Sequence, residues 1–179
     1  MNPILFNTEM VRATLDDRKT VTRRVVKPQP RNIVADEKKR EPLSFLADLE
    51  WVKPPYQPGD ILYVRETWAK LETVYGVPYY AYKADDETLY HSSGENFEGW
   101  HPSIHMPREA ARIFLRVTDV RVQKLKDITD ADALREGFYS RASLVTELLK
   151  MYPDCTADSW FWVVQFERIS REEAMQHAI

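Results

Sequence analysis

Lys19 and Thr22 are the residues whose types and spacing most directly suggest chemistry in this chain. They lie three residues apart in the segment Leu15–Val25. The cations that flank them are Arg18, Arg23 and Arg24. Lys19 and Thr22, together with these cations, can bind an anion in one cavity, or the cations can form an ordinary solvated edge.

Glu136 is the carboxylate that can complete such a site. The residues Thr129 to Asp132 predict a helix that starts with a threonine cap and an acid at its third position, and Gly137 ends it. Glu136 therefore occupies the last turn, where the helix dipole disfavours a negative charge. Either this turn frays and Glu136 is solvated, or the carboxylate is held there for proton transfer.

A helix and a strand must position Lys19 and Thr22. The apolar pattern over residues 10–15 predicts a short helix that Thr8 caps from in front, and the β-branched residues 20–26 predict a strand. On that strand Thr22 shares one face with Arg24, while Arg23 lies on the other face beside valines. Lys19 at the mouth of the strand and Thr22 within it can thus point into one cavity.

The next predicted strand covers Ile61 to Trp68 and alternates cleanly. Glu66 falls on its apolar face, and Tyr63 and Arg65 fall on the other. A carboxylate in an apolar stripe either pairs or takes up a proton. Because Arg23 also lies on an apolar face, the pattern predicts an Arg23–Glu66 ion pair that fixes register or serves the chemistry.

The remaining elements predict an α+β fold. Strands are expected over residues 79–83, 111–125 and 160–169, and helices over 142–152 and from Ser170 onward. The apolar face of the strand 111–125 changes near Thr118 and Asp119, which requires a bulge or bend. A bent strand of this kind suits a small closed β-barrel of about five to six strands, flanked by helices.

Two long stretches without clear periodicity are expected to be surface excursions. Residues 27–60 hold six prolines and the charged run 36–41, and residues 84–108 hold Trp100 and Arg108. An aromatic and a basic group on such a loop can stack on a base and bind phosphate, or simply cap a core.

Composition limits the classes of function. At 179 residues and 44% hydrophobic residues the chain fits one domain, residues 1–179. The net charge is −3, yet residues 1–40 carry ten Lys or Arg against five Asp or Glu, which leaves −8 for the remainder. A local basic patch suits a small anionic or single-stranded ligand better than a long duplex.

Because Cys155 is the single cysteine and the histidines lack ligand spacing, we expect no disulfide, metal or cofactor. Because the sequence has no apolar stretch long enough to span a membrane, we expect a cytoplasmic protein.

The order of these elements resembles the ASCH domain of the PUA-like superfamily. The family signature Gly-x-Lys-x-x-Glu-x-Arg matches residues 17–24 at Lys19 and Arg24, with Asp17 at the glycine and Thr22 at the glutamate. The motifs Arg-Lys-Thr-x-Thr-Arg-Arg, Pro-Gly-Asp-x-Leu-x-Val-Arg-Glu-Thr-Trp and His-Met-Pro-Arg are similar to those of the longer ASCH proteins of phages and prophages. The resemblance extends over nearly the whole chain and implies a single barrel domain.

With Thr22 at the glutamate position of the signature, the chain resembles an ASCH branch that has threonine there and hydrolyses N4-acetylcytidine without a metal. Carried over, the resemblance implies Lys19, Thr22 and Glu136 as its catalytic set, with Asp132 as an alternative acid. Three hypotheses follow: a module that binds RNA or a modified nucleotide, which we favour, an amidohydrolase, and a ribonuclease that uses Lys19 and Glu136 as acid and base. Failing these, a protein partner is expected. The expected nucleotide-binding residues are Arg18, Arg23, Arg24, Tyr63, Arg65, Glu66, Trp68, Trp100 and Arg108.

Overall fold

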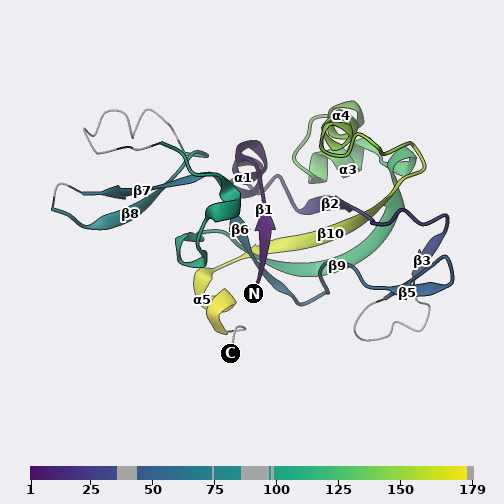
Figure 1. Ribbon diagram of the computed structural model, residues 1–179, viewed down its shortest axis with the longest axis horizontal. Coiled ribbons are helices and arrows are strands. Elements are labelled where there is room, and N and C mark those ends of the chain that lie inside the picture. Colours follow the sequence, from purple (N-terminus) through teal and green to yellow (C-terminus); the bar gives the residue numbers. More distant parts are fainter. Residues whose placement is uncertain (36–43, 74, 86–96, 98, 177–179) are drawn as a thin grey trace. The chain divides into compact units, whose positions relative to one another are not determined.

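A computed structural model describes residues 1–179 except 36–43, 74, 86–96, 98 and 177–179 (Figure 1). The fold is α+β, as predicted. The described elements form a five-stranded sheet of order β1-β6-β9-β10-β2, a three-stranded sheet β3-β4-β5 and a two-stranded ribbon β7-β8. In the described residues no pairing joins β1 to β2, so closure into a barrel stays a prediction. The chain divides into two compact units, and the division falls within β9 and β10. Each unit is described separately below.

Unit 1 comprises residues 1–16, 61–115 and 168–179. Its elements are β1 (Asn2–Leu5), α1 (Thr8–Leu15), β6 (Ile61–Arg65), β7 (Trp68–Glu72), β8 (Pro78–Tyr82), the 3-10 turns η1 (Ser103–His105) and η2 (Arg108–Ala110), and α5 (Arg171–Gln176). Strand β1 runs parallel to β6, and β7 pairs antiparallel with β8. Tyr63, Met106 and Phe114 belong to a buried cluster in this unit.

Two sequence predictions need correction in unit 1. The N-cap of α1 is Asn7 rather than Thr8, because the Asn7 side chain accepts a hydrogen bond from the Met10 amide at 2.9 Å. The predicted strand over residues 61–68 is two strands, since the chain leaves β6 after Arg65 and Trp68 begins β7. The backbone amide of Glu66, between the two strands, contacts Met106 Sδ at 3.2 Å.

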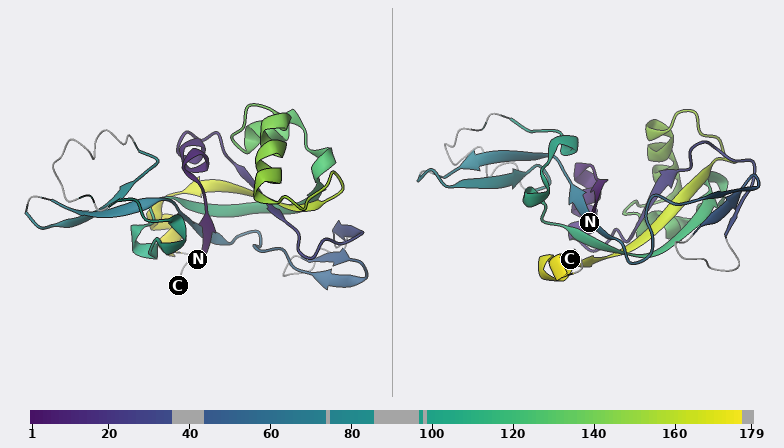
Figure 2. Two further views of the ribbon diagram at one scale, coloured as in Figure 1. Left: turned by 45° about the horizontal axis from the view of Figure 1, so that its top comes forward. Right: turned by 60° about the horizontal axis from the view of Figure 1, so that its bottom comes forward.

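Unit 2 comprises residues 17–60 and 116–167. Its elements are β2 (Val21–Val25), β3 (Ile33–Ala35), β4 (Phe45–Ala47), β5 (Glu50–Val52), most of β9 (Phe114–Lys124), η3 (Leu125–Asp127), α3 (Asp130–Arg135), α4 (Arg141–Met151) and most of β10 (Trp160–Ile169). Strand β2 pairs antiparallel with β10. Helices α3 and α4 lie together on one side of β10 (Figure 2), and Leu144 and Leu148 of α4 share a buried cluster with Phe161.

Local signals in unit 2 agree with the elements they predicted. Thr129 and Asp132 form the expected capping box at the start of α3, and Gly137 follows its end with φ 89°. Thr118 and Asp119 of β9 are both exposed before Val120 is buried, so the burial pattern changes face where predicted. Asp17, which the sequence analysis aligned with the glycine of the ASCH signature, adopts φ 56°, the left-handed conformation that glycine favours.

The excursion over residues 27–60 contains structure that the sequence did not predict. Strands β3, β4 and β5 form an antiparallel sheet within it. The turn between β4 and β5 is Asp48-Leu49, with φ of 48° and 75°. A two-residue turn with both φ positive is normally signalled by Asn-Gly or Asp-Gly, so this hairpin lacks the usual glycine. The charged run 36–41 and much of the second excursion, 84–108, lie outside the described residues.

Candidate functional site

Lys19 and Glu136 meet in unit 2, as the sequence analysis expected. They form an isolated antiparallel β-bridge, and the Thr20 amide donates to the Arg135 carbonyl at 2.8 Å. The Lys19 ammonium donates to the carbonyls of Val21 at 2.9 Å and Glu136 at 3.2 Å, and lies 3.9 Å from Glu136 Oε1. Main-chain pairing therefore holds the end of α3 against the start of β2.

Arg23 completes this buried cluster of charges. Its amide donates to Glu136 Oε1 at 2.8 Å, and its Nη1 donates to Glu136 Oε2. Its Nη2 donates to Gln123 at 2.7 Å and lies 3.0 Å from Asp132 Oδ1. Burial alone would raise the pKa of the Asp132 carboxyl. Hydrogen bonds from Thr129 and Gln123 and the charge of Arg23 outweigh burial, so the net pKa lies well below its usual range and Asp132 is ionised.

The predicted Arg23–Glu66 pair is wrong, because each residue has other partners. Arg23 binds Glu136 and Asp132, whereas Glu66 in unit 1 accepts two hydrogen bonds from Arg112, at 2.9 and 3.0 Å. Arg112 also binds Asp85 at 2.8 Å. Burial raises the pKa of Glu66 although Arg112 opposes that shift. Alternation along each strand identified both residues as buried charges but could not identify their partners.

Burial lowers the pKa of Lys19 to about 8. The charge of Glu136 opposes this shift, and the charges of Arg24 and Arg23 add to it. A lysine with such a pKa is partly neutral near neutral pH and is thereby able to accept a proton.

Unfolding measurements test this shift in pKa. An unfolded lysine stays protonated to higher pH than the buried one, so the free energy of unfolding should rise with pH above 8. The expected rise between pH 7.5 and 9.5 is about 2 kcal/mol. That window ends before Tyr82 titrates, since burial raises its pKa to about 12. Urea unfolding at several pH values should show the rise in the wild type and lose it in Lys19→Met.

Thr22 has a different environment from the Lys19–Glu136 pair. Its side chain is fully buried, and its hydroxyl accepts a hydrogen bond from Arg24 Nη1 at 2.9 Å. Arg24 Nη1 also donates to the Arg23 carbonyl at 2.9 Å. Thr22 and Arg24 share one face of β2, and alternation places Arg23 on the other.

The face of β2 that carries Thr22 and Arg24 adjoins aromatic rings that the sequence analysis did not assign to a site. Trp162 of β10 is the register partner of Arg24, and its ring packs edge-on against Phe45 with centroids 5.0 Å apart. Burial raises the pKa of Tyr56, and the charge of the nearby Arg24 opposes that shift. The pairing of β10 with β2 brings Trp162 beside Arg24, and no local sequence signal encodes that pairing.

The other predicted nucleotide-binding residues have varied contacts. Arg18 lies in unit 2, where its Nη1 is 3.5 Å from the Gly137 carbonyl. In unit 1, Arg65 donates to the Ile104 carbonyl at 3.2 Å and its guanidinium lies 5.7 Å from the Tyr63 ring centroid. Further contacts in unit 1 are those of Trp68 with His101, Trp100 with Phe97, and Arg108 with Met1 Sδ.

Among the described residues, no group of three or more His, Cys, Asp or Glu side chains gathers as metal ligands would. No helix in that part of the chain combines the length and the apolar character of a membrane span.

Comparison with solved structures gives a weak similarity. No protein-family model matches the sequence, and no curated protein matches it. The crystal structure of protein EF3133 from Enterococcus faecalis V583, of the family DUF984, is similar with 11% identity and a TM-score of 0.47, over 98% of this chain and 81% of that one. Similarity at this level identifies neither the family nor the function of the chain.

Proposed function

We propose that the chain is an ASCH-type module that binds RNA or a modified nucleotide. The observation that carries the proposal is the position of Arg24, a half-buried residue whose Nη1 donates to the Thr22 hydroxyl and the Arg23 carbonyl and whose register partner on β10 is Trp162. A guanidinium fixed in this way matches the bidentate geometry of a phosphate.

The buried cluster supports this role by fixing β2. Arg23, Glu136 and Asp132 hold the strand from the face opposite Arg24, so the guanidinium is presented from a rigid element. Rigid presentation lowers the entropy lost on binding. Tyr56, near Arg24 and partly exposed, is a residue type on which bases stack in RNA-binding proteins, whereas Trp162 is buried and supports the strand from within the core.

The resemblance of residues 17–24 to the ASCH signature supports the same proposal. Lys19 and Arg24 occupy signature positions, and Asp17 has the backbone conformation that the signature glycine favours. RNA or a modified nucleotide is the ligand class that this resemblance implies, and a basic segment on an otherwise acidic chain agrees with it.

Arg24→Ala is expected to weaken binding of single-stranded RNA about tenfold or more, because a charge-assisted contact to phosphate is lost. Fluorescence anisotropy with a labelled oligouridine at several salt concentrations measures the affinity. In the variant, the slope of log affinity against log salt concentration should become shallower by the amount that about one phosphate contact contributes.

Arg116→Ala is the matched control, since Arg116 belongs to the same unit and forms a partly exposed ion pair with Glu167 at 2.8 Å. Its affinity for RNA should equal that of the wild type. Equal loss in both variants would mean that Arg24 contributes only general charge, and no binding by the wild type would refute the proposal.

An amidohydrolase is the second candidate, and the observation that favours it is Lys19, a buried amine with a pKa of about 8 and 3.9 Å from Glu136 Oε1. In this mechanism neutral Lys19 takes the Thr22 proton, Thr22 attacks the acetyl carbon of N4-acetylcytidine, the cytosine amine leaves with the proton from Lys19, and water then releases acetate from Thr22. The full burial of Thr22 means that the substrate must first open this face. Glu136, the partner of Lys19, binds Arg23 on the face of β2 opposite Thr22, so the strand must also shift to bring the amine and the hydroxyl together. Release of cytidine, followed by ultraviolet absorbance and lost in Thr22→Ala, would establish the amidohydrolase. Cleavage of the labelled RNA in the binding assay would instead indicate the third candidate, a ribonuclease.

A further inference from the structure

Thr22 carries a hydroxyl at a position of β2 where packing favours an apolar side chain. Its side chain is 0% exposed, and its register partner on β10 is Val164, which is also 0% exposed. Valine differs from threonine by a methyl group in place of the hydroxyl, so it would pack here without burying a polar group. The burial of a hydroxyl at this position therefore indicates a role for the polar atom.

The hydrogen bond between Thr22 and Arg24 indicates what that role is. Arg24 Nη1 donates to the Thr22 hydroxyl at 2.9 Å and to the Arg23 carbonyl at 2.9 Å. Among the residues that the structure describes, Arg24 is the one hydrogen-bond partner of the Thr22 hydroxyl. The donors of a guanidinium lie in one plane, so two acceptors on a single nitrogen fix the orientation of that plane.

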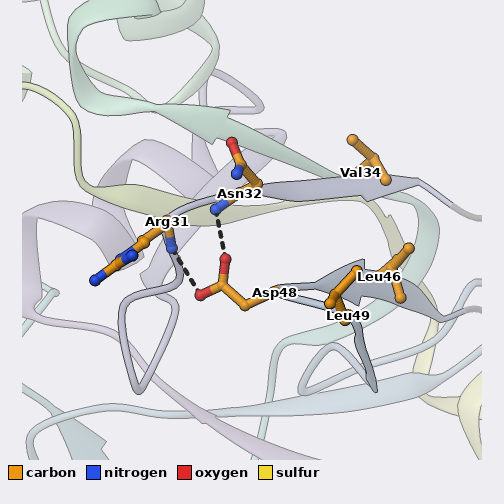
Figure 3. A pocket seen from close by; sticks show the side chains of 6 residues that line it. All are labelled: Arg31, Asn32, Val34, Leu46, Asp48 and Leu49. Atoms are coloured by element: carbon orange, nitrogen blue, oxygen red, sulfur yellow. Dashed lines mark hydrogen bonds between the residues drawn. The ribbon is translucent and has the colours of Figure 1, made fainter.

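Packing holds the surroundings of Arg24 in place. Its register partner Trp162 packs edge-on against Phe45 of β4, with ring centroids 5.0 Å apart. The turn after β4 is tied to the start of β3 by Asp48, whose carboxylate accepts hydrogen bonds from the backbone amides of residues 31 and 32 at 2.8 and 2.9 Å (Figure 3). Close packing of this kind fixes the strand, whereas hydrogen bonds set the direction of a guanidinium.

We infer that Thr22 is a positioning residue of the proposed binding site, and that its hydroxyl orients the Arg24 guanidinium for a phosphate group of the ligand. In this role the hydroxyl oxygen accepts a hydrogen bond and takes no part in a covalent step. The inference rests on the proposed function and deepens it, because it makes phosphate the group that the site selects. The ligand class is then a nucleotide, alone or within RNA, rather than a free nucleoside.

Thr22→Val tests this role, because it removes the hydroxyl and keeps the charge of Arg24. We expect it to weaken binding of the labelled oligouridine about fivefold, the loss that follows from one intramolecular hydrogen bond. The slope of log affinity against log salt concentration should equal that of the wild type, whereas Arg24→Ala makes the slope shallower. Thr22→Ser retains the hydroxyl and should restore the affinity to within about twofold of the wild type.

A double variant shows whether Thr22 acts through Arg24. In the Arg24→Ala background, Thr22→Val should cause no further loss of affinity, because the group that the hydroxyl orients is gone. Thr14→Val is the matched control, since Thr14 of α1 is 1% exposed and its hydroxyl donates to the Met10 carbonyl at 2.8 Å. It also removes a buried hydroxyl, and its affinity for RNA should equal that of the wild type.

Competition against the labelled oligouridine tests the ligand class. Uridine monophosphate should displace the oligonucleotide from the wild type at a concentration about tenfold or more below that of uridine, because only the nucleotide offers a phosphate to Arg24. Thr22→Val should reduce this preference. If uridine monophosphate competes no better than uridine, the inference is overturned.

The outcomes distinguish this inference from the proposed function. Wild-type affinity in Thr22→Val, with loss in Arg24→Ala, would overturn the inference alone. So would failure of Thr22→Ser to restore binding, or a further loss from Thr22→Val in the Arg24→Ala background, because Thr22 would then act by its shape or by direct contact with the ligand. Absence of RNA binding by the wild type would overturn both.

Discussion

Glu136→Gln is expected to lower the free energy of unfolding by about 3–5 kcal/mol. The substitution keeps the size of the side chain but removes the charge that faces Arg23 and Lys19, both fully buried. Asp132 then remains as the one carboxylate paired with Arg23 in the described residues of this cluster. Urea unfolding followed by tryptophan fluorescence measures the loss, and a change below about 1 kcal/mol would show that the pair contributes little.

A double-mutant cycle distinguishes the observed partner of Arg23 from the one predicted by sequence. Removing Arg23 and Glu136 together should cost less than the sum of the single changes, since neither charge is left unpaired. Arg23 and Glu66 should instead be additive within about 0.5 kcal/mol. Coupling between Arg23 and Glu66 would contradict the pairing described here.

Arg112→Met in unit 1 should lower the free energy of unfolding by a similar amount, about 3–5 kcal/mol at pH 7. The substitution leaves Glu66, 1% exposed, without the guanidinium that donates to both its oxygens. It also removes the cation that lies 3.9 Å from the Tyr82 ring centroid.

The effect of Arg112→Met should depend on pH. Burial already raises the pKa of Glu66, and without Arg112 the pKa rises further, so the folded variant holds a proton that the unfolded chain has lost. Stability of the variant therefore falls as pH rises, and the loss relative to the wild type should be smaller at pH 5 than at pH 7. Arg116→Met, which breaks a partly exposed pair, should cost less than about 1 kcal/mol at both pH values.

Local physics explains which parts of the fold the sequence predicted. The capping box of Thr129 and Asp132 and the turn at Gly137 predicted α3 and placed Glu136 at its end, because caps depend on neighbouring residues. Alternation along a strand also depends on neighbouring residues, and it predicted that Arg23 and Glu66 are buried.

Long-range pairing explains what was missed. The bond from Arg23 to Glu136 joins residues 113 positions apart and depends on how β2 meets α3. The sheet β3-β4-β5 was missed because its turn, Asp48-Leu49, lacks the glycine by which such turns are identified. The place of Trp162 beside Arg24 depends on the pairing of β2 with β10, which links residues far apart in the sequence.

Asp17 has a consequence for recognising chains with a similar motif. Its φ of 56° shows that an aspartate here supplies the backbone geometry that a glycine would supply. A search pattern that insists on glycine at the head of the motif would pass over such chains, whereas a pattern that admits any residue tolerant of this geometry would retain them.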